Sequence, residues 1–298
     1  MNDIRYRKTR RKDLIEAGKL IRTSVNNLRV KNGLKPQRWR LAGIPPQLDH
    51  LRKTDPGLSV CAWDGDKLVG YTSALVRGQQ WYLSQLFVHP RYQDKGVGRQ
   101  MLERVWQDSP SMTHSLCTFA YNMQAVGIYS RFGMAPLCDL PWLHADPKKT
   151  RQLQPTGLKI IDSHTRADLK WLNELESKIR GYAHPQEWKL WLSNEKYKLY
   201  FFTNHGKKIG YGMILNNMAI APVGVISPEY MIDVMTEMIR LAKPKKGKKI
   251  MLWCPTQNIK LYRFLIEIGF RASELEIFMS DTPYPDWQRY VPATLAVL

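Results

Sequence analysis

The stretch that decides the fold is Leu86–Gln100, which reads LFVHPRYQDKGVGRQ. Its first part is apolar and stops at Pro90, a pattern that predicts a strand. Its second part contains Gln93-x-x-Gly96-x-Gly98 and leads into Gly96–Gln107, where apolar residues recur at helical spacing. We therefore predict a strand, a glycine turn and a helix in direct succession.

The composition of this turn favours phosphate binding. Glycines let backbone N–H groups approach oxygen atoms, and a helix N-terminus adds unpaired donors with partial positive charge. Lys95, Arg99 and the preceding Arg91 add full positive charges. A dinucleotide fingerprint needs a third glycine where Met101 stands, and the Gly-Lys-Ser/Thr of a P-loop is missing. The alternative to a pyrophosphate site is an ordinary loop between a strand and a helix.

Strands and helices alternate along the chain, and their order repeats. Lys67–Tyr71 (KLVGY) aligns without a gap with Lys207–Tyr211 (KKIGY). Further on, Asn122–Met134 aligns with Asn258–Phe270, with equal spacing between the Asn and the Gly of each segment. Self-similarity of this kind predicts two copies of one α/β unit in tandem.

The length of 298 residues suits two such copies. We expect a first domain over residues 1–145 and a second over residues 157–298. The polar segment 146–156, which contains Pro155, is the expected linker.

The net charge is +19, with basic runs at Arg5–Lys12 and Lys243–Lys249. Such a charge suits contact with a polyanion, although a solvated basic surface explains it as well. The four cysteines are scattered, which predicts free thiols without a disulfide framework or a zinc site. The sequence shows neither a signal peptide nor a stretch of transmembrane length, so we expect a cytoplasmic protein without a membrane partner.

At this point the sequence resembles the GNAT superfamily of acyl-CoA N-acyltransferases. The cofactor signature of that family, Gln/Arg-x-x-Gly-x-Gly/Ala, is matched by Gln93, Gly96 and Gly98. A second signature, Asn-x-x-Ala-x-x-x-Tyr-x-x-x-Gly-Phe, is matched from Asn122 through Tyr129, with Met134 in place of the final Phe. The resemblance is specific for residues 1–145.

The resemblance implies an α/β (α+β) fold, in which each copy is a mixed, mostly antiparallel twisted sheet flanked by helices. It implies acetyl-CoA as the acyl donor and no metal. The expected cofactor-binding residues are Leu86, Phe87, Val88, Gln93, Asp94, Lys95, Gly96, Val97, Gly98, Arg99 and Asn122.

The implied reaction is direct attack of an acceptor amine on the thioester. Tyr129 is the candidate general acid that protonates the leaving thiolate, and the alternative for this side chain is a core aromatic. An N–H group of Phe87 or Val88 is the candidate donor to the thioester oxygen. The general base is less well defined: a water held by Ser84 is one possibility, and His89 or His114 is another.

The second copy departs from the family at its active positions. Its counterpart of the turn, near Gly224–Pro228 (GVISP), lacks the glycine pattern, and Leu265 stands where Tyr129 stands in the first copy. We therefore expect a degenerate copy without a CoA site of its own. The aromatic C-terminal segment Tyr284–Pro292 is a candidate wall of the acceptor cleft, and interdomain packing is its alternative.

The function that follows is N-acetylation of a primary amine on a small-molecule or amino-acid-like acceptor. Two alternatives stay open: a protein or ribosomal-protein acetyltransferase that uses the basic surface, and a non-catalytic acyl-CoA-binding regulator. A monomer and a homodimer are both compatible with a tandem repeat.

Overall fold

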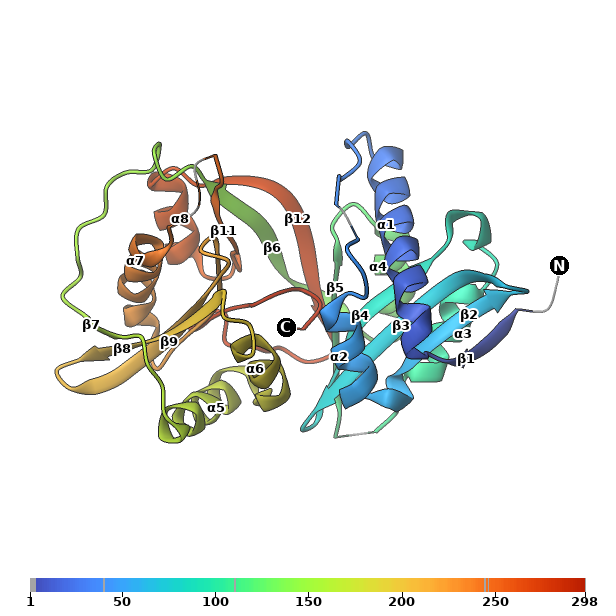
Figure 1. Ribbon diagram of the computed structural model, residues 1–298, viewed down its shortest axis with the longest axis horizontal. Coiled ribbons are helices and arrows are strands. Elements are labelled where there is room, and N and C mark those ends of the chain that lie inside the picture. The colour runs from blue at the N-terminus through green and yellow to red at the C-terminus, as the bar shows by residue number, and fades with distance from the viewer. Residues whose placement is uncertain (1–3, 40, 110, 244, 246, 298) are drawn as a thin grey trace. The chain divides into compact units, whose positions relative to one another are not determined.

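The computed structural model describes residues 4–39, 41–109, 111–243, 245 and 247–297. These residues form two compact units. The first comprises residues 1–116 and 121–133, and the second comprises residues 117–120 and 134–298. Each unit is a sheet with helices on both faces (Figure 1), which confirms the predicted mixed α/β fold class.

The sheet of the first unit has the strand order β1-β2-β3-β4-β5. Its pairs are antiparallel except for the parallel pair β4–β5. The elements of this unit are β1 (Arg5–Lys8), α1 (Leu14–Lys31), α2 (Pro46–Thr54), β2 (Ser59–Asp64), β3 (Lys67–Arg77), β4 (Gln80–Val88), α3 (Val97–Val105), β5 (Thr113–Phe119) and α4 (Met123–Arg131).

Two small cores hold the helices of the first unit to this sheet. Successive residues of a strand point to opposite faces. Accordingly, Cys61 packs in the cluster that contains Leu14 and Leu20 of α1, whereas the adjacent Ala62 packs with Val97 and Met101 of α3. The sheet thus lies between α1 and α3, and this arrangement brings the start of α3 to the end of β4.

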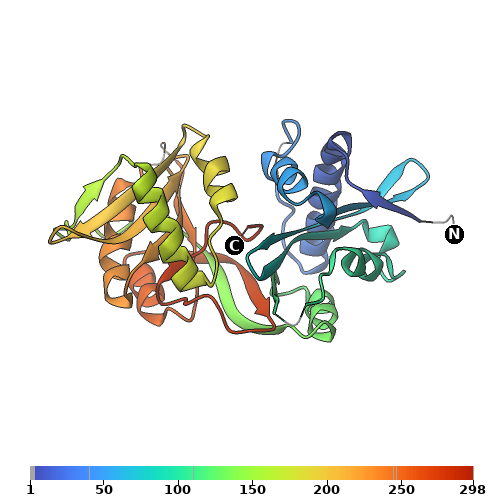
Figure 2. The same cartoon turned by 90° about the horizontal axis from the view of Figure 1, so that it is seen from below.

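In the second unit the strand order is β12-β6-β11-β10-β9-β8-β7, and β13 pairs with β10. Helices α5 and α6 cover one face, and α7 and α8 cover the other (Figure 2). The elements are β6 (Ala135–Ala145), β7 (Lys159–Ile161), α5 (Arg166–Arg180), α6 (Pro185–Leu192), β8 (Tyr197–Asn204), β9 (Lys207–Leu215), β10 (Ala219–Val225), α7 (Met231–Leu241), β11 (Ile250–Trp253), α8 (Ile259–Glu267), β12 (Arg271–Ser280) and β13 (Tyr290–Val291).

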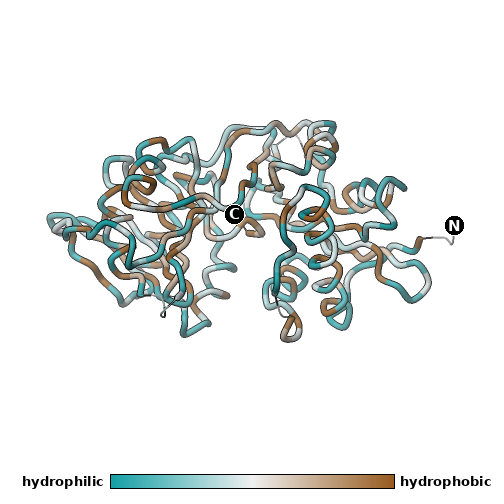
Figure 3. Tube along the Cα trace, turned by 90° about the horizontal axis from the view of Figure 1, so that it is seen from above, coloured by the Kyte–Doolittle hydropathy of each residue, from teal (hydrophilic) through white to brown (hydrophobic). Residues whose placement is uncertain are grey.

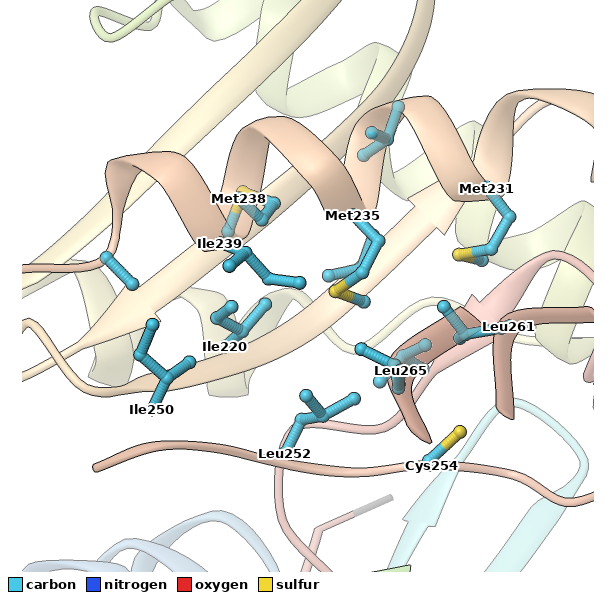
Figure 4. Packing of buried hydrophobic residues seen from close by; sticks show 14 of the residues in the cluster. Ile220, Met231, Met235, Met238, Ile239, Ile250, Leu252, Cys254, Leu261 and Leu265 are labelled. Atoms are coloured by element: carbon cyan, nitrogen blue, oxygen red, sulfur yellow. The ribbon is translucent and has the colours of Figure 1, made fainter. Parts of the chain in front are cut away.

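The core of the second unit is rich in methionine. Met231, Met235 and Met238 of α7 point toward Ile220 of β10 and Leu265 of α8 (Figure 4). All of them are less than 2% exposed. Flexible methionine side chains fill irregular space between a helix and a sheet well. Leu265, which replaces the tyrosine of the first copy, is therefore part of a dry core.

The compact units differ from the expected domains in one strand and one connection. β6 was expected to close the first domain, but it lies between β11 and β12, and its Leu143 belongs to the core of the second unit. The expected linker also packs on this unit, because Arg151 N–H donates to Ile268 O at 3.1 Å and Thr156 N–H donates to Glu237 Oε1 at 2.7 Å. Pairing over such sequence distances leaves no local signal.

Hydrophobic and hydrophilic residues are interleaved along the helices (Figure 3). Among the described residues, no helix is both long enough and apolar enough to cross a bilayer. Among the described residues, none of the four cysteines forms a disulfide.

A buried charged cluster anchors α5 in the second unit. Glu176 accepts hydrogen bonds from Tyr211 Oη at 2.8 Å and from Trp188 Nε1 at 3.1 Å, and it lies 3.5 Å from Arg180 Nη1. Glu176 and Arg180 are both 0% exposed. Burial opposes ionisation of Glu176, yet His184, whose Nδ1 lies 2.6 Å from Glu176 Oε2, together with Arg180 holds the pKa of this carboxyl below its usual value.

We predict that Glu176→Ala lowers the free energy of unfolding by about 3–5 kcal/mol, because it leaves the Arg180 guanidinium buried without its carboxylate. Denaturant titration measures the change. Glu174→Ala on the exposed side of the same helix is the control, and we expect a change within about 0.5 kcal/mol. Equal effects of the two substitutions would contradict the role given to the cluster.

Candidate acyl-CoA site in the first copy

The site begins at an irregularity of β4. The register between β3 and β4 shifts between the pairs Ser73–Gln85 and Ala74–Leu83, so Ser84 is an extra residue on β4. The parallel pairing of β4 with β5 ends close by, at Leu83–Leu116. A bulge of this kind bends a strand and ends its pairing. From Ser84 onward, β4 therefore separates from β5 and leaves one edge open.

Along this part of β4, the backbone N–H groups point alternately toward β3 and toward the open edge. His89 N–H donates to Val69 O at 2.8 Å, so the N–H of Val88 faces the opposite, open edge. By the same alternation, the N–H of Phe87 faces β3. Of the two candidate donors to a thioester oxygen, only Val88 therefore has the required direction.

Two side chains hold the end of β4 in place. Val88 O accepts hydrogen bonds from Ser24 Oγ of α1 at 3.0 Å and from Gln93 Nε2 at 3.2 Å. The side chain of Gln93, a residue of the turn, thus links the turn to the end of β4. Nothing in the sequence around Ser24 predicted its part in this arrangement.

The turn itself runs from Gln93 to Gly96. Asp94 has φ 60° and Gly96 has φ 76°, and α3 begins at Val97. The first helical hydrogen bond runs from Gln100 N–H to Gly96 O at 3.0 Å. Within the described part of the chain, the N–H groups of residues 93–99 find no acceptor. This run of donors at a helix N-terminus can receive the oxygens of a pyrophosphate.

The two glycines of the turn serve different purposes. Gly96 adopts a left-handed conformation that other residues enter at a cost, although a side chain there would meet open space. Gly98 lies against the end of β4, and an added Cβ would stand 3.4 Å from Val88 Cγ2. A large side chain at Gly98 would therefore fill the space in front of the open edge.

Two lysine ammonium groups lie close to the ring of Tyr92, beside the turn. Lys95 Nζ lies 5.4 Å and Lys67 Nζ lies 5.7 Å from the ring centroid, while the Tyr92 hydroxyl donates to Asp64 Oδ2 at 2.7 Å. Lys67, on β3, was not expected from the sequence. Arg99 is largely exposed and pairs with Glu103 at 2.9 Å, an interaction that contributes little to stability.

Helix α4 borders the same turn. Asn122 caps the helix, accepting from Ala125 N–H at 3.4 Å. Gln124 Nε2 donates to Asp94 Oδ1 and ties α4 to the turn. In this arrangement the amide nitrogen of Asn122 stays available for a ligand.

Tyr129 lies in α4 and is 7% exposed. No hydrogen bond or charge from another described residue shifts the pKa of its hydroxyl. Burial raises the pKa of this phenol well above its usual value. The Tyr129 phenol therefore stays neutral at physiological pH.

Comparison with known proteins agrees with this geometry. Residues 28–134 match the model of the acetyltransferase (GNAT) family. A GCN5-related N-acetyltransferase from Sphaerobacter thermophilus matches with a TM-score of 0.63 at 18% identity, covering 99% of this chain and 98% of that chain. The chain is a tandem GNAT-fold protein. No curated protein matches its sequence.

Other solved structures extend over both GNAT copies. A candidate acetyltransferase from Pyrococcus horikoshii has a TM-score of 0.74 at 13% identity, covering 100% of this chain and 96% of that chain. A tandem GNAT protein from the clavulanic acid biosynthesis pathway has a TM-score of 0.57 at 13% identity, covering 95% of this chain and 100% of that chain. At these identities the likeness shows the fold.

The three residues considered for the general base differ in their surroundings. Ser84 Oγ is enclosed and has no partner among the described residues. His89 Nδ1 accepts from Arg91 N–H at 3.3 Å, and burial together with nearby Lys67 lowers the pKa of His89. His114 is 5% exposed, and its ring stacks on Trp106. The two histidines thus serve capping and packing in the GNAT copy.

The second GNAT copy lacks the turn altogether. In the first copy, Gln93–Gly96 separate the short helix Pro90–Tyr92 from α3. In the second, the equivalent helix Pro228–Tyr230 runs directly into α7 at Met231. The glycine turn of the first copy therefore has no counterpart there, in agreement with the expected degeneration.

Proposed function

We propose that the first copy transfers the acetyl group of acetyl-CoA to a primary amine of a small-molecule or amino-acid-like acceptor. The observation that carries the proposal is the open edge of β4, which leads directly into a turn whose N–H groups have no acceptor among the described residues. Such a site suits a ligand that joins an extended, amide-bearing arm to a pyrophosphate.

The chemistry follows from the backbone N–H of Val88 and the side chain of Tyr129. Val88 N–H donates to the thioester oxygen, which gains negative charge as the amine nitrogen attacks the carbonyl carbon. The carbon–sulfur bond breaks, and Tyr129 gives its proton to the departing thiolate. The proton lost by the attacking amine passes to water, and solvent then returns a proton to Tyr129.

Binding and turnover test this proposal separately. We expect one acetyl-CoA to bind per chain, as measured by calorimetry. We also expect release of free CoA, measured with a thiol reagent, when a panel of primary amines is supplied. Binding without release for every amine, including peptide and ribosomal-protein amines, would contradict catalysis and leave the acyl-CoA-binding regulator. Contact with a polyanion stays a prediction of the net charge.

A further inference from the structure

The C-terminal segment Asp286–Val291 runs along β10 of the second unit. Within it, β13 pairs antiparallel with β10 through Val291–Val223 and Tyr290–Gly224. Val225 N–H donates to Arg289 O at 3.1 Å. The segment thus adds a strand to an edge of β10, next to the place where that strand leaves β11.

This edge is the counterpart of the open edge in the first copy. Gly70 pairs with Val88, and the aligned Gly210 pairs with Val225. β10 also carries one extra residue between Ile220 and Val223, as β4 does at Ser84. Val225 N–H is therefore the equivalent of Val88 N–H, and in the second copy it already holds a peptide carbonyl.

The two helix-capping asparagines extend the comparison. Asn258 accepts from Leu261 N–H at 3.0 Å, as Asn122 accepts from Ala125 N–H. The Asn258 amide nitrogen donates to Trp287 O at 3.3 Å and to Gln288 O at 3.1 Å. The second copy thus binds the backbone of the C-terminal segment through the Asn258 side-chain amide nitrogen. The equivalent nitrogen of Asn122 is available for a ligand in the first copy.

The segment is seated over its whole length. Asp286 N–H donates to Ile179 O of α5 at 2.7 Å, and Trp287 is 3% exposed. Tyr290 is 0% exposed, and the Arg180 guanidinium lies 4.9 Å from its ring. Backbone bonds at both ends and buried side chains between them are the features of peptide recognition by strand addition.

We propose that the second copy is a peptide-binding groove whose ligand is the chain's own C-terminal segment, Asp286–Val291. The segment takes the place that the amide-bearing arm of acetyl-CoA takes in the first copy. The equivalence with CoA rests on the proposed function, whereas the seating of the peptide does not. The segment Tyr284–Pro292, which was expected to line an acceptor cleft, contains the residues that occupy this groove.

Cleavage of the folded chain tests the proposal. Asp281–Pro283 are exposed, so a specific protease site inserted after Thr282 allows the C-terminal fragment to be cut free after folding. We expect the fragment to stay bound through gel filtration. A labelled synthetic peptide of the same sequence should replace it slowly. Immediate loss of the fragment from the cleaved protein would overturn the proposal.

Matched asparagine variants provide the control. Asn258→Asp keeps the helix cap but removes both donors, so we expect fragment release about tenfold faster or more. In the uncut chain, Val225 N–H should exchange with solvent faster by a similar factor. Asn122→Asp should leave both rates unchanged. Equal release from the two variants would overturn the proposal, and neither readout depends on acetyl-CoA binding or activity.

Discussion

Gly98→Trp is expected to weaken acetyl-CoA binding on the order of a hundredfold or more, because its side chain fills the space between the start of α3 and Val88. The ligand would lose several bonds from charged oxygens to backbone N–H groups, and each such bond contributes about 1.5–3 kcal/mol. Titration calorimetry measures the affinity, and thermal unfolding reports the integrity of the fold.

The matched control for this substitution is Gly57→Trp. Gly57 is exposed, has no other atom within 4 Å of an added Cβ and lies outside the site. We expect its affinity for acetyl-CoA to stay within about twofold of the original protein, which corresponds to about 0.4 kcal/mol. An equal loss in the two variants would indicate general damage to the fold, and normal binding by Gly98→Trp would place the cofactor elsewhere.

The second large effect concerns Tyr129→Phe. Removal of the phenol proton should lower kcat by about a hundredfold or more while the affinity for acetyl-CoA changes little. Stability should stay near that of the original protein, because no hydrogen bond from another described residue perturbs this hydroxyl. Steady-state kinetics at saturating acetyl-CoA measures kcat. Collapse of affinity with normal turnover at saturation would contradict the assignment.

The pH dependence provides a further check on Tyr129. A general acid is active while protonated, so its contribution disappears as pH rises through its pKa. Burial raises the pKa of Tyr129 above the usual value of about 10. Turnover should therefore show no loss from this group between neutral pH and about pH 10. A loss of turnover below about pH 10 that is absent from Tyr129→Phe would show that the pKa of the phenol is not raised.

Local patterns predicted the features that depend on local chemistry. The glycine turn after β4 follows from Gln93, Gly96 and Gly98, because a left-handed residue and a close helix start need those residue types. The tandem copies could likewise be predicted, from the equal spacing of the repeated segments. The loss of the active-site tyrosine position in the second copy was visible from Leu265, which the structure places in the hydrophobic core.

Features that depend on contacts between residues far apart in the chain could not be predicted from the sequence. The sequence of β6 predicts a strand but not its partners. Its pairing with β11 and β12 makes it part of the second unit. The same holds for the C-terminal segment, whose aromatic residues fit a cleft wall as well as a groove. Ser24 and Lys67 reach the site through packing of α1 and through the start of β3, which single-sequence patterns do not encode.

Hydrogen exchange of the whole chain with and without acetyl-CoA tests the central claim most directly. We predict that acetyl-CoA slows exchange at Val88 and at Val97–Arg99 of the first copy, with one ligand bound per chain. We predict no change at Val225 of the second copy, whose N–H already donates to Arg289 O. Protection in the second copy, or binding without protection at Val88 and the turn, would contradict the assignment of the site.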